Sequence, residues 1–177
     1  DGPFELQNVV CEDAVSMRGA NIEDTMTIDG GTYHHHVILS EITATDEVEI
    51  ADPTIGGAID ITEAELHERA TLDAVKILID DQEAASEAGL NDVDEPDNDG
   101  VGLATSDCVC EKQLYLRDCT IHGSFVGTTM DAPTLAVFGT TVHGELNLTQ
   151  STFHRTLGFK DTRISGQFNF FSMEASH

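Results

Sequence analysis

Residues 142–170 read VHGELNLTQSTFHRTLGFKDTRISGQFNF, and apolar side chains recur in this stretch every 11 residues. Small polar residues recur at the same interval two positions before the first series, at Thr140, Ser151 and Thr162. The three apolar series are Val142, Phe153, Ile164; Leu146, Leu157, Phe168; and Leu148, Phe159, Phe170.

The same interval runs from the first residues of the chain to Ile79. One set of positions reads Leu6, Met17, Ile28, Leu39, Ile50, Ile61 and Leu72, and a second reads Cys11, Ile22, Tyr33, Ala44, Ile55, Leu66 and Ile77. Nearly every residue two positions before these is also apolar or small. Such agreement over so many repeats indicates a repetitive fold.

Residues two apart face the same way in an extended segment, because side chains alternate along a strand. An amphipathic helix needs apolar residues at i, i+3, i+4 and i+7, which these series do not supply. Successive pairs are displaced by five and six residues in turn. The pattern therefore predicts an all-β solenoid of parallel strands with four sides and about 22 residues per turn, in which stacked turns share one interior.

The pattern resembles that of the pentapeptide-repeat family, in which every fifth residue is an inward Leu or Phe with a small inward residue two positions earlier. The matching inward residues are Ile22, Ile55, Leu66, Ile121, Val142, Phe153 and Ile164, and their small partners are Ala20, Pro53, Ala64, Cys119, Thr140, Ser151 and Thr162. The resemblance implies a right-handed quadrilateral β-helix. This chain departs from the family because alternate sides have six residues, so it resembles a degenerate variant with an 11-residue half-turn.

The whole chain, residues 1–177, is expected to form one solenoid domain. Residues 4–79 form its N-terminal turns and 101–175 its C-terminal turns. Between them, residues 80–100 read as an acidic insertion with a short helix and a turn-rich loop at one corner. One step in the repeat is a residue short, which predicts a local irregularity at Asp131 to Thr134.

The charge of the chain is extreme, with 33 Asp and Glu against 8 Lys and Arg and a formal net charge of -25. This composition is typical of proteins from salt-loving microbes, whose carboxylate surfaces hold monovalent cations. The alternative is an acidic face that binds a basic partner or imitates DNA. Direct binding of nucleic acid is not expected, since the sequence has no basic stripe. No segment is apolar enough to span a bilayer and no signal peptide is visible.

Three groups of residues are candidates for metal binding or thiol chemistry. The acidic run at residues 92–99 lacks the glycine and the final Glu of a calcium-binding loop. His34 to His36 fall at a corner, and His122 and His143 occupy matching positions one turn apart. The four cysteines fall on inward positions, where they act as small apolar residues and favour a reducing, cytoplasmic compartment. We predict no metal, cofactor or catalytic site, and we expect a protein that is not an enzyme.

The expected function is that of a structural or scaffolding repeat protein whose partners are proteins, with assembly end to end. The repeat reaches both ends of the sequence without a capping pattern, so both terminal turns would expose strand edges. Two alternatives stay open: a DNA-mimicking protein that binds a DNA topoisomerase, as the family resemblance implies, and a metal-binding or carbohydrate-acting β-helix. The residues expected at the end-to-end interface are Phe4, Leu6, Phe168, Phe170 and Phe171.

Overall fold

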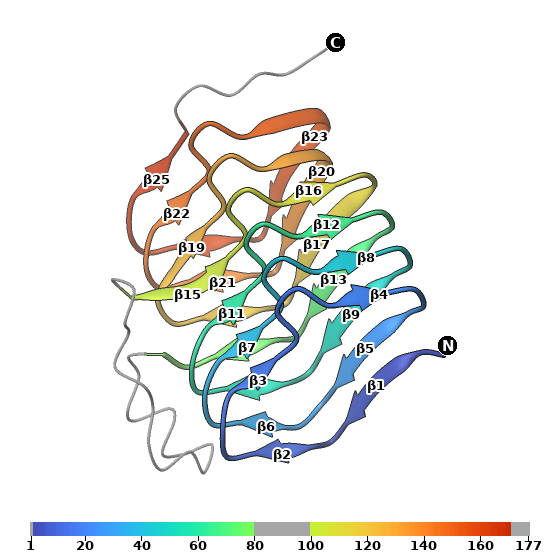
Figure 1. Cartoon of the computed structure of the whole chain (residues 1–177). Helices are drawn as coiled ribbons and strands as arrows, with labels where there is room; N and C mark the ends of the chain where they lie inside the picture. Colours follow the sequence, from blue (N-terminus) through green and yellow to red (C-terminus); the bar gives the residue numbers. More distant parts are fainter. Residues whose placement is uncertain (1, 80–99, 171–177) are drawn as a thin grey trace.

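The computed structural model describes residues 2–79 and 100–170, and it is an all-β solenoid of about seven turns (Figure 1). Twenty-five strands form three parallel sheets, and no helix occurs in the described ranges. Each turn has four sides, called here A, B, C and D in chain order. Sides A and D belong to one 11-stranded sheet, because β20 and β23 continue from side D of one turn into side A of the next.

Side A contains β1 (Phe4–Gln7), β5 (Met26–Asp29), β9 (Val48–Ala51), β13 (Ala70–Asp73), β17 (Gln113–Arg117) and the second halves of β20 (Asp131–Phe138) and β23 (Thr152–Lys160). Side D contains β4 (Asn21–Ile22), β8 (Thr43–Ala44), β12 (Glu65–Leu66), β16 (Val109–Cys110) and the first halves of β20 and β23.

Side B contains β2 (Val10–Cys11), β6 (Thr32–Tyr33), β10 (Thr54–Ile55), β14 (Lys76–Ile77), β18 (Thr120–Ile121), β21 (Thr141–Val142) and β24 (Arg163–Ile164). Side C contains β3 (Val15–Ser16), β7 (Val37–Ile38), β11 (Ile59–Asp60), β15 (Val101–Ala104), β19 (Ser124–Val126), β22 (Leu146–Asn147) and β25 (Phe168–Asn169).

The register between turns confirms the predicted spacing. Met26 lies beside Val48 and Val48 beside Ala70, so each turn advances by 22 residues. Ala70 then lies beside Leu114, a step of 44, because the chain leaves at the corner after β14 and returns to side C in phase at β15. Residues 80–99 lie outside the described residues, and the short helix expected there with them.

The expected irregularity at Asp131 to Thr134 is also confirmed. Leu114 lies beside Leu135, a step of only 21 residues, and the register of β20 against β23 shifts between Ala132 and Thr134. One residue is missing from the corner between sides D and A at Pro133. β20 runs through this corner as one strand of eight residues, and β23 does so with nine.

The interior consists of the predicted rows of inward side chains. Met26, Ile28, Tyr33 and Val37, for example, are fully buried in the second turn. The small partners named from the sequence are inward too: Ala64, Thr140 and Ser151 have no exposed surface. Their hydroxyls are satisfied by main-chain carbonyls, as Ser151 donates to Gly127 O at 2.7 Å and Thr140 to Phe138 O at 3.1 Å.

A left-handed residue at one corner of each half-turn is a feature that the sequence analysis missed. These residues follow the strands of sides A and C and mostly recur every 11 positions. A left-handed conformation turns the chain sharply, but it is costly for residues with a Cβ. The positions are Asn8, Gly19, Gly30, Glu41, Asp52, Glu63, Ala74, Asp107, Asp118, Thr129, Gly139, Gln150 and Asp161. The recurrence of Asn, Asp and Gly was the available signal.

Candidate functional site: two open ends and one side face

The N-terminal turn is an unfinished layer of the interior. Phe4 occupies the same inward row as Met26, yet it is 37% exposed whereas Met26 is fully buried. Leu6, Val15 and Met17 are likewise only partly buried against the core. A hollow of about 530 Å³ opens at this end, lined by Gly2, Phe4, Met17, Ala20, Asn21, Ile22, Glu23 and Asp24. Two of the predicted interface residues, Phe4 and Leu6, therefore lie at one end face.

The described residues of the C-terminal turn are partly exposed in the same way, at the opposite end of the solenoid (Figure 1). Phe168 lies in register with the fully buried Leu146, but it is 45% exposed. Its ring packs edge to face against Phe170 at 3.9 Å and against Phe159 at 5.3 Å between centroids. Three aromatic rings from sides A and C thus cover this end of the interior. Phe171, also expected here, lies outside the described residues.

Charge changes sign between the two ends. Residues 2–22 of the first turn carry Glu5, Glu12 and Asp13 against Arg18, a net charge of -2. The last turn, from residue 152 to residue 170, carries only Asp161 against the three basic residues Arg155, Lys160 and Arg163, a net charge of +2. In a chain of net charge -25, a positive end face is a local exception.

Ion pairs in this solenoid join neighbouring turns. Arg69 on side A reaches Glu47 one turn away at 3.1 Å, and His67 reaches Glu111 at 3.0 Å. The pairs Arg18–Glu41, Arg117–Asp73 and His154–Asp131 also connect residues of adjacent turns. The hydrogen bond from Arg117 holds the pKa of Asp73 below its usual range.

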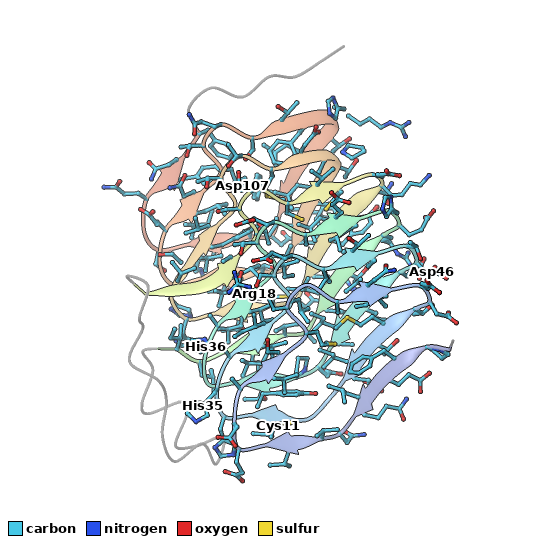
Figure 2. The ribbon with its side chains drawn as sticks, viewed as in Figure 1. Cys11, Arg18, His35, His36, Asp46 and Asp107 are labelled. Atoms are coloured by element: carbon cyan, nitrogen blue, oxygen red, sulfur yellow. The ribbon has the colours of Figure 1, made fainter. Side chains whose placement is uncertain are left out.

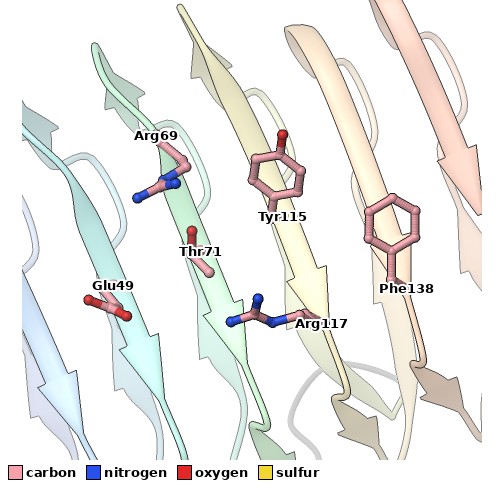
Figure 3. Close-up of a pocket in the computed structure, with 6 residues that line it drawn as sticks. All are labelled: Glu49, Arg69, Thr71, Tyr115, Arg117 and Phe138. Atoms are coloured by element: carbon pink, nitrogen blue, oxygen red, sulfur yellow. The ribbon is translucent and has the colours of Figure 1, made fainter.

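One side face contains a shallow pocket (Figure 3). Its volume is about 280 Å³, and its lining residues are Glu49, Arg69, Thr71, Tyr115, Arg117 and Phe138. Tyr115 stands on β17 and Phe138 on the adjacent strand β20. Arg117 is the next outward residue after Tyr115 on β17, and its side chain extends toward Thr71 on β13. Tyr115 donates a hydrogen bond to Gln113 Oε1 at 2.7 Å.

The side-A segments on one side of this pocket, from β17 onward, carry no outward carboxylate, whereas β9 and β13 on the other side carry Glu49 and Asp73. On β17 and the side-A halves of β20 and β23, the positions that alternate with the inward rows are Gln113, Tyr115, Arg117, Thr134, Ala136, Phe138, Thr156, Gly158 and Lys160. Aromatic and Arg side chains are enriched at protein-binding surfaces, but here both arginines are already paired with acids, Arg69 with Glu47 and Arg117 with Asp73.

The histidines are placed as the repeat predicts. The rings of His122 and His143 stack at 4.2 Å with 13° between their planes. His35 and His36 lie at a corner of the second turn (Figure 2), where His36 Nδ1 accepts a hydrogen bond from Ala58 N. His34 turns further inward than expected and is only 9% exposed. Within residues 2–79 and 100–170, no group of three or more His, Cys, Asp or Glu is arranged to hold a metal ion. The acidic run at 92–99 lies outside these ranges.

All four cysteines are free, and three of them are buried. Cys108 and Cys110 face each other with 3.7 Å between their sulfurs. Burial raises the pKa of Cys119 to about 11, and the neighbouring thiol together with burial raises that of Cys108. Thiols of raised pKa carry little thiolate and are poor nucleophiles. They serve as small interior residues, as predicted.

No known protein family, curated protein or solved structure matches this chain. Residues 2–79 and 100–170 contain no helix that could cross a membrane.

Proposed function

We propose that this protein is a non-enzymatic structural protein that associates with itself through the two ends of its solenoid. The observation that carries the proposal is the exposure of inward side chains at both ends. Phe4 and Phe168 are 37% and 45% exposed, whereas their neighbours in the same rows, Met26 and Leu146, are fully buried.

A further turn placed on either end would supply what these rows lack. Covering apolar surface is favourable by about 25 cal/mol per Å². The terminal strands also present main-chain groups on one edge, and pairing with a strand of another chain satisfies them. Repeat proteins gain stability from each such neighbour interface.

We also propose that the fold is a degenerate right-handed relative of the pentapeptide-repeat β-helices. Support comes from sides B and D, where Ile55, Leu66 and Val142 are buried with the small partners Pro53, Ala64 and Thr140. Sides A and C carry bulky residues at both inward positions, as at Val48 and Ile50. The two kinds of side alternate, which accounts for the 11-residue period.

The test is the concentration dependence of the sedimentation coefficient for the protein and three variants. Phe4→Asp and Phe168→Asp should each lower the association constant at least tenfold, because a buried unpaired carboxylate is costly. Phe138→Asp is the matched control, since Phe138 has the same 37% exposure as Phe4 but lies on a side face. A protein that stays monomeric at every concentration, or a control that fails equally, would contradict the proposal.

DNA mimicry is the alternative function, and one observation favours it. Residues 2–79 carry sixteen carboxylates and only three basic residues, Arg18, Arg69 and Lys76. Such a surface presents a row of negative charges to a DNA-binding enzyme. A DNA gyrase supercoiling assay in the presence of the protein tests this alternative, and unchanged supercoiling at a large excess of the protein rules it out.

A carbohydrate-binding role, the second alternative, would use the side-face pocket. The faces of Tyr115 and Phe138 could take the apolar face of a sugar, with Arg69, Thr71 and Arg117 meeting its hydroxyls. Titration of the protein with neutral oligosaccharides, compared with Tyr115→Ala, tests it. Equal heats for both proteins would exclude this pocket.

A further inference from the structure

We infer that the proposed self-association is head to tail and in register, with β1 to β3 of the next copy continuing the sheets of β23 to β25 of the first. The inference rests on the proposed function and adds the polarity of the assembly and its pairs of residues. Its partner is a second copy of this chain. A head-to-tail contact uses two different surfaces and therefore propagates into a filament.

The internal register defines the alignment across the joint. In most joints of the solenoid, each residue lies beside the residue 22 positions earlier. Continuing that step past the last turn places Phe4 of the next copy over Leu157 and Leu6 over Phe159. On side C it places Met17 of the next copy over Phe170.

The corners agree with the same alignment. Asn8 of the next copy falls over Asp161, and both residues have the left-handed conformation, with φ of 50° and 54°. The left-handed corners of successive turns lie over one another in the same way at Asp52 and Ala74. Strands and corners of the two ends are therefore in phase together.

The two end faces also differ in shape. The N-terminal face has the hollow of about 530 Å³, whose apolar lining includes Phe4, Met17 and Ile22. The C-terminal face presents the cluster of Phe159, Phe168 and Phe170. In the register above, Met17 on the wall of the hollow meets Phe170 of the cluster, so the cluster extends the apolar side of the hollow, whereas two hollows or two clusters would not complement each other.

Charge selects the same polarity. The first turn has a net charge of -2 and the last turn of +2. Head-to-tail contact brings opposite signs together, whereas head-to-head or tail-to-tail contact brings like signs together. Head-to-tail stacking also keeps the strands parallel, as in every joint within the chain.

Two ion pairs are expected across the joint. In this register Glu5 of the next copy lies over Gly158, and Lys160 is the next outward residue along the same strand. Arg163 likewise lies two positions from the site over which Glu12 of the next copy falls. Asp131 lies beside Thr152 and pairs at 2.6 Å with His154, two residues further along the strand, so such a diagonal pair already joins two turns inside the protein. Side chains in diagonal positions, about 7–8 Å apart at Cα, are within reach of long residues.

The experiment is a charge exchange measured by sedimentation velocity at low salt. A tail variant carries Lys160→Glu and Arg163→Glu, and a head variant carries Glu5→Lys and Glu12→Lys. Each alone should associate about tenfold more weakly than the wild type, because two exposed attractive pairs become repulsive. An equimolar mixture of the two variants should regain association, since each supplies the complementary end. The chain with all four changes should regain it too.

The control variant carries Lys76→Glu and Lys112→Glu, which make the same change in net charge as the tail variant but away from both ends. It should associate as the wild type does. If the wild type, the tail variant and the head variant associate equally, the head-to-tail inference is wrong but the proposed self-association is retained. If the wild type is monomeric, the proposed function itself fails. A mixture that does not recover association overturns the inference.

Discussion

The turns built by residues 2–79 carry sixteen carboxylates and three basic side chains, whereas those built by residues 100–170 carry six and five. Their net charges are therefore -13 and -1. Both segments nevertheless have the same inward rows, the same four sides and the same parallel register. The carboxylates are therefore unevenly divided between the two described segments.

The comparison shows that interior and surface are specified by separate sets of positions. In a solenoid, inward and outward residues alternate along each strand, so a change in one row leaves the other intact. Stability of both segments should depend on the same interior rows. Their response to salt, and their partners, should differ.

The largest expected effect compares two matched core positions. Ile50→Ala in the third turn and Leu116→Ala in the fifth remove fully buried side chains from the same inward row. Each should lower the free energy of unfolding by about 2–5 kcal/mol. Urea denaturation measures both. A cost confined to one segment would show that the two interiors are not equivalent.

The left-handed corners provide the next comparison. Gly139 has φ of +61°, a conformation that is strained for any residue with a Cβ, so Gly139→Ala should destabilise by about 1–2 kcal/mol. In the same row, Ala74 has φ of 53°, and Ala74→Gly should stabilise by up to about 1 kcal/mol. Opposite shifts of the thermal midpoint are expected. Shifts of the same sign would show that corner geometry does not limit stability.

A buried hydroxyl distinguishes the N-terminal segment. Tyr33 is fully buried, its Oη has no hydrogen-bond partner, and burial raises its pKa. Tyr33→Phe removes an unsatisfied polar atom and should stabilise the protein by about 1 kcal/mol. Tyr115→Phe is the control, because the Tyr115 hydroxyl already has a partner in Gln113. Destabilisation by Tyr33→Phe would indicate that its hydroxyl is satisfied in solution.

Rising salt concentration should stabilise the two segments to different extents. Repulsion among the carboxylates of residues 2–79 is screened as monovalent salt rises, because the Debye length falls from about 10 Å at 0.1 M to about 3 Å at 1 M. Native-state hydrogen exchange should show a few-fold gain in protection for β5 and β9 and little gain for β21 and β22. Equal gains in both segments would remove electrostatic repulsion as the cause.

The smallest effect concerns the ion pair that joins the segments across β13 and β17. Arg117 lowers the pKa of Asp73, so the pair stabilises the folded state above the unfolded pKa of about 3.9. This contribution is lost as the pH falls through the lowered folded value. Wild type and Arg117→Gln should differ slightly at neutral pH and converge in acid. A difference in stability between the two proteins that persists at the lowest pH would show that Arg117 contributes through packing and not through its charge.

Much of the fold follows from the sequence because each inward row repeats a chemical type at a fixed interval. The rows that contain Ile28 and Ile55 were predicted, and both residues are fully buried. The short step before Leu135 was also visible as a missing residue. The left-handed corners were missed because Glu41, Glu63 and Ala74 are not residues that ordinarily mark such a turn.

The candidate site was predicted only in part. Phe4 and Phe168 were identified because they begin and end the repeat, and the structure places them at opposite end faces. The side-face pocket was not foreseen, since Arg69 and Phe138 are 69 positions apart in the chain. Only the stacking of turns brings them together.

The sequence by itself determined the length of a turn, the four sides and the identity of the inward rows, because the alternation of side chains along a strand is a local property of the chain. Tertiary structure alone decided which outward residues meet. Arg117 pairs with Asp73 across 44 positions because the chain re-enters the stack in phase after residue 99.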